Sequence, residues 1–230
     1  MQESGARRLP RGRHALPRAE VQRIQRSRLC RAMADVMAEK GYVATSVADV
    51  LKRAVVSRQS FYELFESKLD CFMAAFEAAG ELLLQRIAEA VDDGAGWARD
   101  GGPPAEAAGD RLGLFERAIT AYLRALSEEM SYARLFLVEV HAAGPEALQR
   151  RAGLQDYITQ ALADLLGVTD EAGRFACHVI VAATSAMVTS AVADNDPDAL
   201  RALGPRLIAH VRVLWDAGVL APSTGQPDGA

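Results

Sequence analysis

Four consecutive side chains that form hydrogen bonds begin a short segment of the chain: Ser57, Arg58, Gln59 and Ser60. Serine is a favoured N-cap, so Ser57 predicts the start of a helix. Side chains in the first turn of such a helix can reach base edges in the major groove of DNA, where Arg pairs with guanine and Gln with adenine. The segment therefore indicates base recognition, and the alternative is the core packing of a short helix.

A second short helix is predicted just before this one. Ser46-Val47-Ala48-Asp49 has the form of a capping box, which opens a helix through about Ala54. Two helices joined by only two residues form a helix-turn-helix, whose second helix enters the major groove. Polar side chains beside the helix ends suit phosphate contacts that position the reading helix. The candidates for phosphate contacts are Thr45, Tyr62 and Lys68, and Ser46 is a further candidate DNA contact.

Charge is distributed unevenly along the chain. Residues 1–68 hold 14 Lys or Arg and 7 Asp or Glu, whereas residues 69–230 hold 12 and 23, although the whole chain has a net charge of −4. This asymmetry predicts a basic binding unit joined to an acidic body. Residues 1–17 are predicted to be a flexible basic arm whose Arg11 and Arg13 enter the adjacent minor groove. A solvated, disordered terminus is the alternative.

Apolar residues recur at spacings of three and four, which predicts an all-α protein of about nine helices. One long helix is expected from Arg18 to Lys40, ended by Gly41. Residues 94–109 are rich in Gly and Pro and predict a mobile loop, and residues 221–230 predict a disordered tail. The expected organisation is a three-helix helix-turn-helix domain over 18–68 and a larger helical body over 69–220.

Residues 29–73 resemble the N-terminal DNA-binding domain of TetR-family transcriptional regulators. The matching features are Gly41-Tyr42, Thr45-Ser46-Val47, Asp49-Val50, Ala54, Val56-Ser57, Tyr62, Phe65, Ser67 and Lys68. The resemblance implies that helix 57–64 reads a pseudo-palindromic DNA operator, with Thr45, Tyr62 and Lys68 on phosphates. It also implies a homodimer that represses transcription and is released by a small-molecule effector. The alternative is a helical ligand-binding or scaffold protein whose head no longer binds DNA.

Three residues depart from the pattern of that family. Leu51 stands where members usually have Ala, Val55 where they have Gly, and Leu64 where they have His. Val55 matters most, because a turn position that favours Gly can require a conformation that is costly for a β-branched residue. We therefore expect either a changed turn or a changed crossing of the two helices.

The body is expected to serve dimerisation and effector binding. Small residues near 170–193 permit close helix approach, and Leu and Val near 197–217 supply apolar area, which suits a four-helix bundle between two subunits. Completion of the monomer core is the alternative for these helices. The helices around 110–140 and 145–166, with the start of the helix near 170–193, are expected to enclose a small hydrophobic effector, or else to be plain core. Candidate lining residues are Phe115, Ile119, Tyr122, Phe136, His141 and Cys177.

Other kinds of chemistry are not indicated. The sequence has no phosphate-binding Gly loop, nucleophile elbow or H-E-x-x-H motif, so we expect no enzyme activity, cofactor or metal. The three cysteines are far apart and odd in number, which favours a reducing compartment. The sequence has no run of about 18 uninterrupted apolar residues, so no membrane span is predicted. It also has no recognisable secretory signal. A cytoplasmic, nucleoid-associated bacterial protein is expected.

Overall fold

The structure is a computed structural model that describes residues 17–92 and 110–220. Within these ranges the chain is helical and has no strand, as predicted. Nine helical rods are present when α6, η2 and α7, which follow one another directly, are taken as one. In chain order the segments are α1 (Arg18–Ala44), α2 (Val47–Ala54), α3 (Arg58–Leu64), α4 (Lys68–Val91), α5 (Arg111–Glu128), α6 (Met130–Arg134), η2 (Leu135–Glu139, a π-helical turn), α7 (Val140–Ala143), α8 (Pro145–Leu166), α9 (Glu171–Ala193) and α10 (Pro197–Asp216).

Side-chain caps determine where several of these helices begin. The Ser46 hydroxyl accepts a hydrogen bond from the Asp49 amide, and the Asp49 carboxylate accepts one from the Ser46 amide at 2.9 Å, so the predicted capping box is confirmed. Ser57 caps α3 in the predicted way, and Asp196 caps α10 ahead of Pro197. Such caps satisfy amides that would otherwise lack a partner in the first helical turn.

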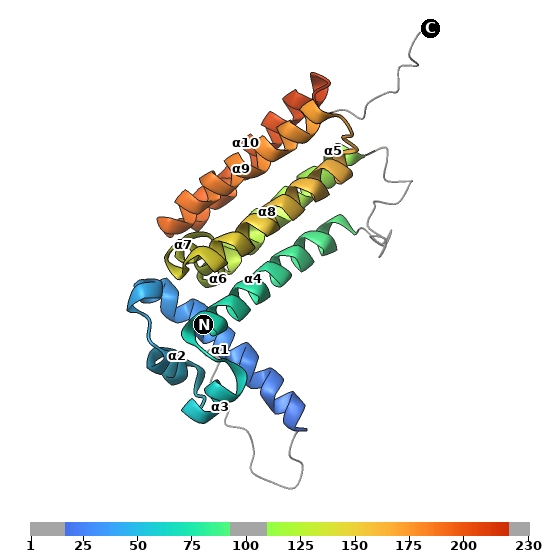
Figure 1. Cartoon of the computed structure of the whole chain (residues 1–230). Coiled ribbons are helices and arrows are strands. Elements are labelled where there is room, and N and C mark those ends of the chain that lie inside the picture. The colour runs from blue at the N-terminus through green and yellow to red at the C-terminus, as the bar shows by residue number, and fades with distance from the viewer. Residues whose placement is uncertain (1–16, 93–109, 221–230) are drawn as a thin grey trace.

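The helices form a small head and a longer body (Figure 1). The head contains α1, α2 and α3, and α4 leads from it into the body, where it packs on α5. In the body α5 also packs against α10, and α8 packs against α9. Helices α9 and α10 lie side by side at the edge farthest from the head. The body is thus layered, with α9 and α10 outermost.

One hydrophobic core runs through both parts. Phe61 and Phe65 of the head are 0% and 2% exposed and hold α3 against its neighbours. At the border, Phe76 of α4 stacks on Phe136 of η2 with ring centroids 4.5 Å apart. Such aromatic contacts add about 0.5–1.5 kcal/mol to the burial of their apolar area. The head is therefore packed onto the body.

The predicted end of the first helix at Gly41 is present as a break inside α1. Gly41 has φ 77° and ψ 166°, and residues 42–44 continue beyond it as a further helical turn. A Cβ at this position would lie 3.3 Å from Oε2 of Glu139. Both the positive φ and the close approach of a body residue therefore favour glycine here.

Helix α9 has one buried and one exposed apolar face. Phe175, Val179 and Met187 are 68%, 45% and 37% exposed, while Cys177, Ile180 and Val188 of the same helix are buried. Among the described helices, α9 is the one whose length and composition would allow it to cross a membrane, and 33% of its most apolar stretch is buried. One face of α9 is thus left uncovered in the single chain.

Candidate DNA-binding surface and effector cavity

Helix α3 presents the predicted base-reading side chains to solvent. Arg58 and Gln59 are exposed in its first turn, directly after the N-cap Ser57. Gln59 donates a hydrogen bond from Nε2 to Oε1 of Glu63 at 3.0 Å, and the Arg58 guanidinium lies 5.9 Å from the ring centroid of Tyr62. Because α3 is anchored by its buried phenylalanines, this exposed first turn has a defined position on the head.

Tyr62 and two of the candidate serines, Ser46 and Ser57, are also exposed at the surface. The Tyr62 side chain is 52% exposed and makes an edge contact with buried Phe61. Ser46 is exposed, and the Ser57 hydroxyl donates to the Ser60 hydroxyl at 2.9 Å. These groups surround the ends of α2 and α3, where phosphate contacts were predicted.

Thr45 is placed differently from the other predicted contacts. Thr45 is only 3% exposed, and its hydroxyl donates a hydrogen bond to the Gly41 carbonyl at 2.7 Å. That carbonyl belongs to the residue at which α1 is interrupted, so the hydroxyl bridges the backbone break. The side chain of Thr45 therefore does not reach the surface that a phosphate would touch.

Lys68 connects the end of α1 to the start of α4. Its Nζ donates to the carbonyls of Tyr42 and Thr45 at 2.9 and 3.0 Å and lies 4.1 Å from the centroid of the Tyr42 ring. Burial lowers the pKa of this lysine. An ammonium group has three N–H donors, so one donor remains for a phosphate. Lys68 thus stabilises the head by connecting α1 to α4, and it is also a candidate phosphate contact.

The turn between α2 and α3 keeps the conformation that favours glycine. Val55 has φ 56° and ψ 46°, and its amide donates to the Leu51 carbonyl as the C-cap of α2. A left-handed conformation costs an ordinary residue about 1–2 kcal/mol. The valine is therefore strained, while the cap hydrogen bond of the turn is kept. Leu51 and Leu64 are half-buried and pack against the core.

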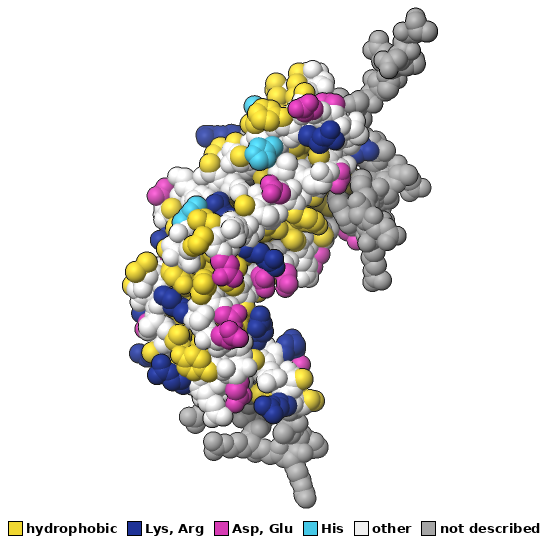
Figure 2. All heavy atoms as spheres, viewed as in Figure 1, with side chains coloured by type: hydrophobic (Ala, Val, Ile, Leu, Met, Phe, Trp, Pro, Cys, Tyr) yellow, Lys and Arg dark blue, Asp and Glu magenta, His cyan; other side chains and the backbone are white. Residues whose placement is uncertain are grey.

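Positive charge in the described head is moderate. Residues 17–68 hold ten Lys or Arg and six Asp or Glu, and dark-blue side chains lie over α2 and along α1 (Figure 2). Lys40 forms an ion pair of 2.7 Å with Asp49, which holds the pKa of that carboxyl far below its usual range. The predicted arm contacts Arg11 and Arg13 lie outside the described residues, as does the expected loop over 94–109.

A buried carboxylate joins the head to the body. Glu139, at the end of η2, is 7% exposed, and its Oε2 accepts a hydrogen bond from the Tyr42 amide at 2.7 Å. Its Oε1 lies 3.3 Å from Nε of Arg134. A second link is more exposed: Arg31 of α1 bonds Glu129 at 2.6 Å and lies 5.2 Å from the centroid of Tyr132. We call Glu139, Tyr42 and Lys68, with their partners, the junction.

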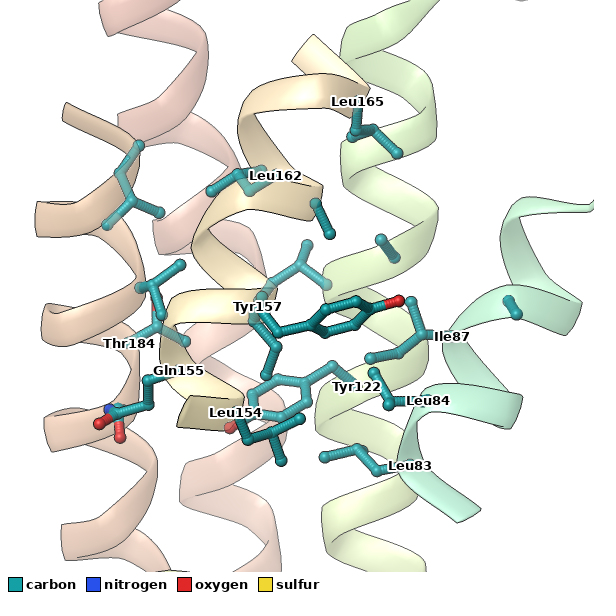
Figure 3. A pocket seen from close by; sticks show the side chains of 18 of the residues that line it. Leu83, Leu84, Ile87, Tyr122, Leu154, Gln155, Tyr157, Leu162, Leu165 and Thr184 are labelled. Carbon is teal, nitrogen blue, oxygen red and sulfur yellow. The ribbon is translucent and has the colours of Figure 1, made fainter. Parts of the chain in front are cut away.

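A cavity of about 480 Å³ lies within the body (Figure 3). It is lined by residues of α4, α5, η2, α8 and α9, and the ring of Tyr157 lies across it toward Ile87. The predicted lining residues Phe115, Ile119, Tyr122 and Phe136 do line it.

Two predicted lining residues are not at the cavity. Cys177 is 0% exposed in the core, where burial raises the pKa of its thiol to about 11. His141 is exposed on α7 and contacts the cavity only through Arg151, whose Nη1 lies 3.2 Å from its Nε2. Both residues lie on faces of their helices that the sequence pattern did not distinguish from the lining face.

Apart from Tyr122, the polar lining residues of the cavity were not predicted. Arg151, Gln155, Thr184 and Ser185 are among the lining residues, and Nη2 of Arg151 donates to the Ser185 hydroxyl at 2.9 Å. A signal for Arg151 does exist in the sequence. It stands three residues before Leu154 on the face of α8 that continues through Ile158, Leu162 and Leu165, which places a cation in line with an apolar stripe. Among the described residues, no group of three or more His, Cys, Asp or Glu could hold a metal ion.

Comparison with known proteins identifies the head. Residues 29–75 match the family described as "Bacterial regulatory proteins, tetR family". This is a family of regulators, which supports the expectation that the chain is not an enzyme. Among curated proteins, no relative matches the sequence.

Several solved structures share the whole fold. A TetR-like transcriptional regulator from Rhodococcus sp. RHA1 is 18% identical with a TM-score of 0.62, and the match covers 86% of this chain and 99% of that one. FadR from Bacillus subtilis, solved in complex with stearoyl-CoA, is 18% identical with a TM-score of 0.63 over 80% and 95% of the two chains.

FadR from Bacillus halodurans, a regulator of fatty acid degradation, is 17% identical with a TM-score of 0.65. That match covers 88% of this chain and 97% of the FadR chain. The likeness therefore extends from the head through the body. The chain carries the N-terminal domain of the tetR family of bacterial regulatory proteins, joined to a helical body with the fold seen in regulators of that family.

Proposed function

We propose that this protein is a homodimeric transcriptional repressor that binds a pseudo-palindromic operator and is released by a small hydrophobic effector. The exposed first turn of α3 supplies base contacts through Arg58 and Gln59, and Tyr62 and the remaining donor of Lys68 supply phosphate contacts. The protein would act in the cytoplasm, at the nucleoid.

The observation that carries this proposal is the double role of η2. Phe136 and Leu137 of this turn line the cavity, and Glu139 of the same turn accepts a hydrogen bond from the Tyr42 amide in the head. A ligand that displaces the two apolar side chains would therefore shift a group that holds the head. Such a connection between two sites is what ligand control of DNA binding requires.

The uncovered faces of α9 and α10 support a dimer. On α9 the exposed stripe combines Phe175, Val179 and Met187 with alanines, and on α10 Val213 is 64% exposed. Pairing these stripes across a two-fold axis would bury them in a four-helix bundle. We expect Phe175→Asp to produce monomers in analytical ultracentrifugation, whereas Leu148→Asp, an exposed apolar position on α8, should leave the dimer intact. A monomeric unmodified protein would contradict the dimer.

Electrophoretic mobility shift with DNA that flanks the gene of this protein tests the DNA-binding role. Arg58→Ala and Gln59→Ala should change the preferred sequence and cost about 1–3 kcal/mol each, because each removes a base contact. Tyr62→Ala should weaken binding to all sequences alike. Arg86→Ala, an exposed arginine on α4, is the matched control. The absence of any shift at low salt would favour the alternative, a helical ligand-binding or scaffold protein with a degenerate head.

A further inference from the structure

Arg151 is the only charged side chain among the described residues that line the cavity. It is half-buried, and burial lowers its pKa. Its polar partners are the Ser185 hydroxyl, to which it donates at 2.9 Å, and Nε2 of His141 at 3.2 Å, and neither belongs to an acidic residue. No Asp or Glu of the described chain forms an ion pair with it. The cavity thus contains a cation without an anion.

The cavity has two different ends, and Arg151 lies at one of them. It lies near the start of α8 and contacts α7, on the side of the body that faces the head. Three polar lining residues lie close to Arg151. Tyr122 interacts with it electrostatically, the Ser185 hydroxyl accepts its hydrogen bond, and Gln155 lies one helical turn further along α8. Burial raises the pKa of the Tyr122 phenol, so its hydroxyl stays a hydrogen-bond donor.

The other end of the cavity is apolar. From Leu154 to Leu165 the α8 face that lines it spans about 16 Å, at a rise of about 1.5 Å per residue. Leu162 and Leu165 lie at that end in Figure 3, away from Leu154 and Gln155. A ligand that fills this space needs an extended apolar tail and one anionic group.

We infer that the cavity binds an unbranched carboxylic acid, with its carboxylate on Arg151 and its hydrocarbon tail along α8 toward Leu165. The planar guanidinium suits a carboxylate because two parallel N–H groups can meet its two oxygens. A single cation matches a single negative charge, whereas a ligand that carries several phosphates would find no further cation among the described lining residues. The inference rests on the proposed function in taking this cavity as the effector site.

Isothermal titration calorimetry on the full chain tests it with three probes of equal chain length: laurate, dodecanol and lauroyl-CoA. Laurate is expected to bind more tightly than dodecanol. Arg151→Met should weaken laurate binding roughly 10- to 100-fold, because hydrogen bonds to a charged group are lost, and should leave dodecanol binding unchanged. Arg150→Met is the matched control, because Arg150 is exposed, pairs with Glu77 at 2.7 Å and does not line the cavity.

Three results would overturn the inference: no binding of laurate, equal affinities for laurate and dodecanol, or Arg151-dependent binding of lauroyl-CoA alone. Mobility shift in parallel separates this inference from the proposed function. If laurate binds through Arg151 but leaves the DNA complex intact, the carboxylate site stands and release by this effector fails. If another compound releases DNA and laurate does not bind, the proposed function stands and the carboxylate site fails.

Discussion

Two half-buried cations, Lys68 at the junction and Arg151 in the cavity, have opposite surroundings. Lys68 lies over an aromatic ring and donates to the carbonyls of Tyr42 and Thr45 at the end of α1. Arg151 meets only a hydroxyl and an imidazole, in a space lined mainly by apolar groups. The groups of the junction are therefore paired within one chain, whereas Arg151 has no acidic partner among the described residues.

The same contrast holds for the acidic groups. Glu139 is buried between a backbone amide and Arg134, so its charge is compensated where it stands. No acidic side chain lines the cavity among the described residues. From this difference we expect substitutions at the junction to reduce stability in the absence of ligand, and substitutions in the cavity to change binding instead.

The largest effect is expected for Glu139→Ala. This change leaves the Tyr42 amide and Arg134 without their partner, and breaking a buried pair costs about 3 kcal/mol or more. Denaturant unfolding should show the loss in the free energy of unfolding. Glu139→Gln, which keeps an acceptor oxygen, should lose clearly less. Equal stability of the alanine variant and the unmodified protein would show that the junction does not depend on this carboxylate.

The next effect is expected for Lys68→Met. Loss of two hydrogen bonds from a charged donor should lower the free energy of unfolding by about 2 kcal/mol. Lys52→Met, on the exposed surface of α2, serves as the control and should change stability by less than about 0.5 kcal/mol. An effect no larger than that of the control would remove Lys68 from the junction.

Val55→Gly should change stability in the other direction. Relief of the left-handed conformation should raise the free energy of unfolding by about 1 kcal/mol, after the entropy cost of glycine in the unfolded state is subtracted. Val55→Ala keeps the positive φ and should gain much less. The side chain is 63% exposed, so little packing is lost in either variant. Thermal unfolding decides the point, and a destabilised glycine variant would refute strain at this turn.

The smallest effect on stability is expected for Arg151→Met. An apolar side chain of similar length replaces a cation that has no anionic partner, so the unliganded protein should keep its stability to within about 0.5 kcal/mol, or gain slightly. The comparison with Lys68→Met uses the same new residue at both sites. If Arg151→Met lowers the free energy of unfolding as much as Lys68→Met does, the unliganded chain stabilises Arg151 as fully as it stabilises Lys68.

Local features of the fold could be predicted from sequence because they depend on residues close together in the chain. The caps Ser46, Ser57 and Asp196 satisfy amides two or three residues away, and the break at Gly41 follows from one residue type. The strained conformation at Val55 was likewise visible as a departure from a family pattern. Helix starts therefore came out as predicted, whereas the turn between α2 and α3 keeps its left-handed conformation and does not show the changed geometry that Val55 suggested.

Features that depend on distant contacts could not be predicted in this way. Phe115, Ile119 and Tyr122 were found because they share one face of α5, but the burial of Glu139 results from its contact with Tyr42, which lies 97 positions earlier. Thr45 faces inward beside the backbone break at Gly41, and Arg151 was not predicted to line the cavity, although it stands in line with the apolar stripe of α8. Charged residues that a fold buries look the same in sequence as those at its surface.

The connection between the cavity and the head depends on the geometry of the π-helical turn η2. The hydrogen bonds of such a turn span one residue more than those of an α-helix. In an α-helix, residues three apart share a face, so Phe136 and Glu139 would point the same way. The wider π turn, with its bonds from residue i to i+5, spreads them around the axis, so that one faces the cavity and the other the head. A deletion of one residue here would restore the regular helical register and place both side chains on one side. The π-helical turn therefore sets which way the buried acid points, separately from the size of the cavity.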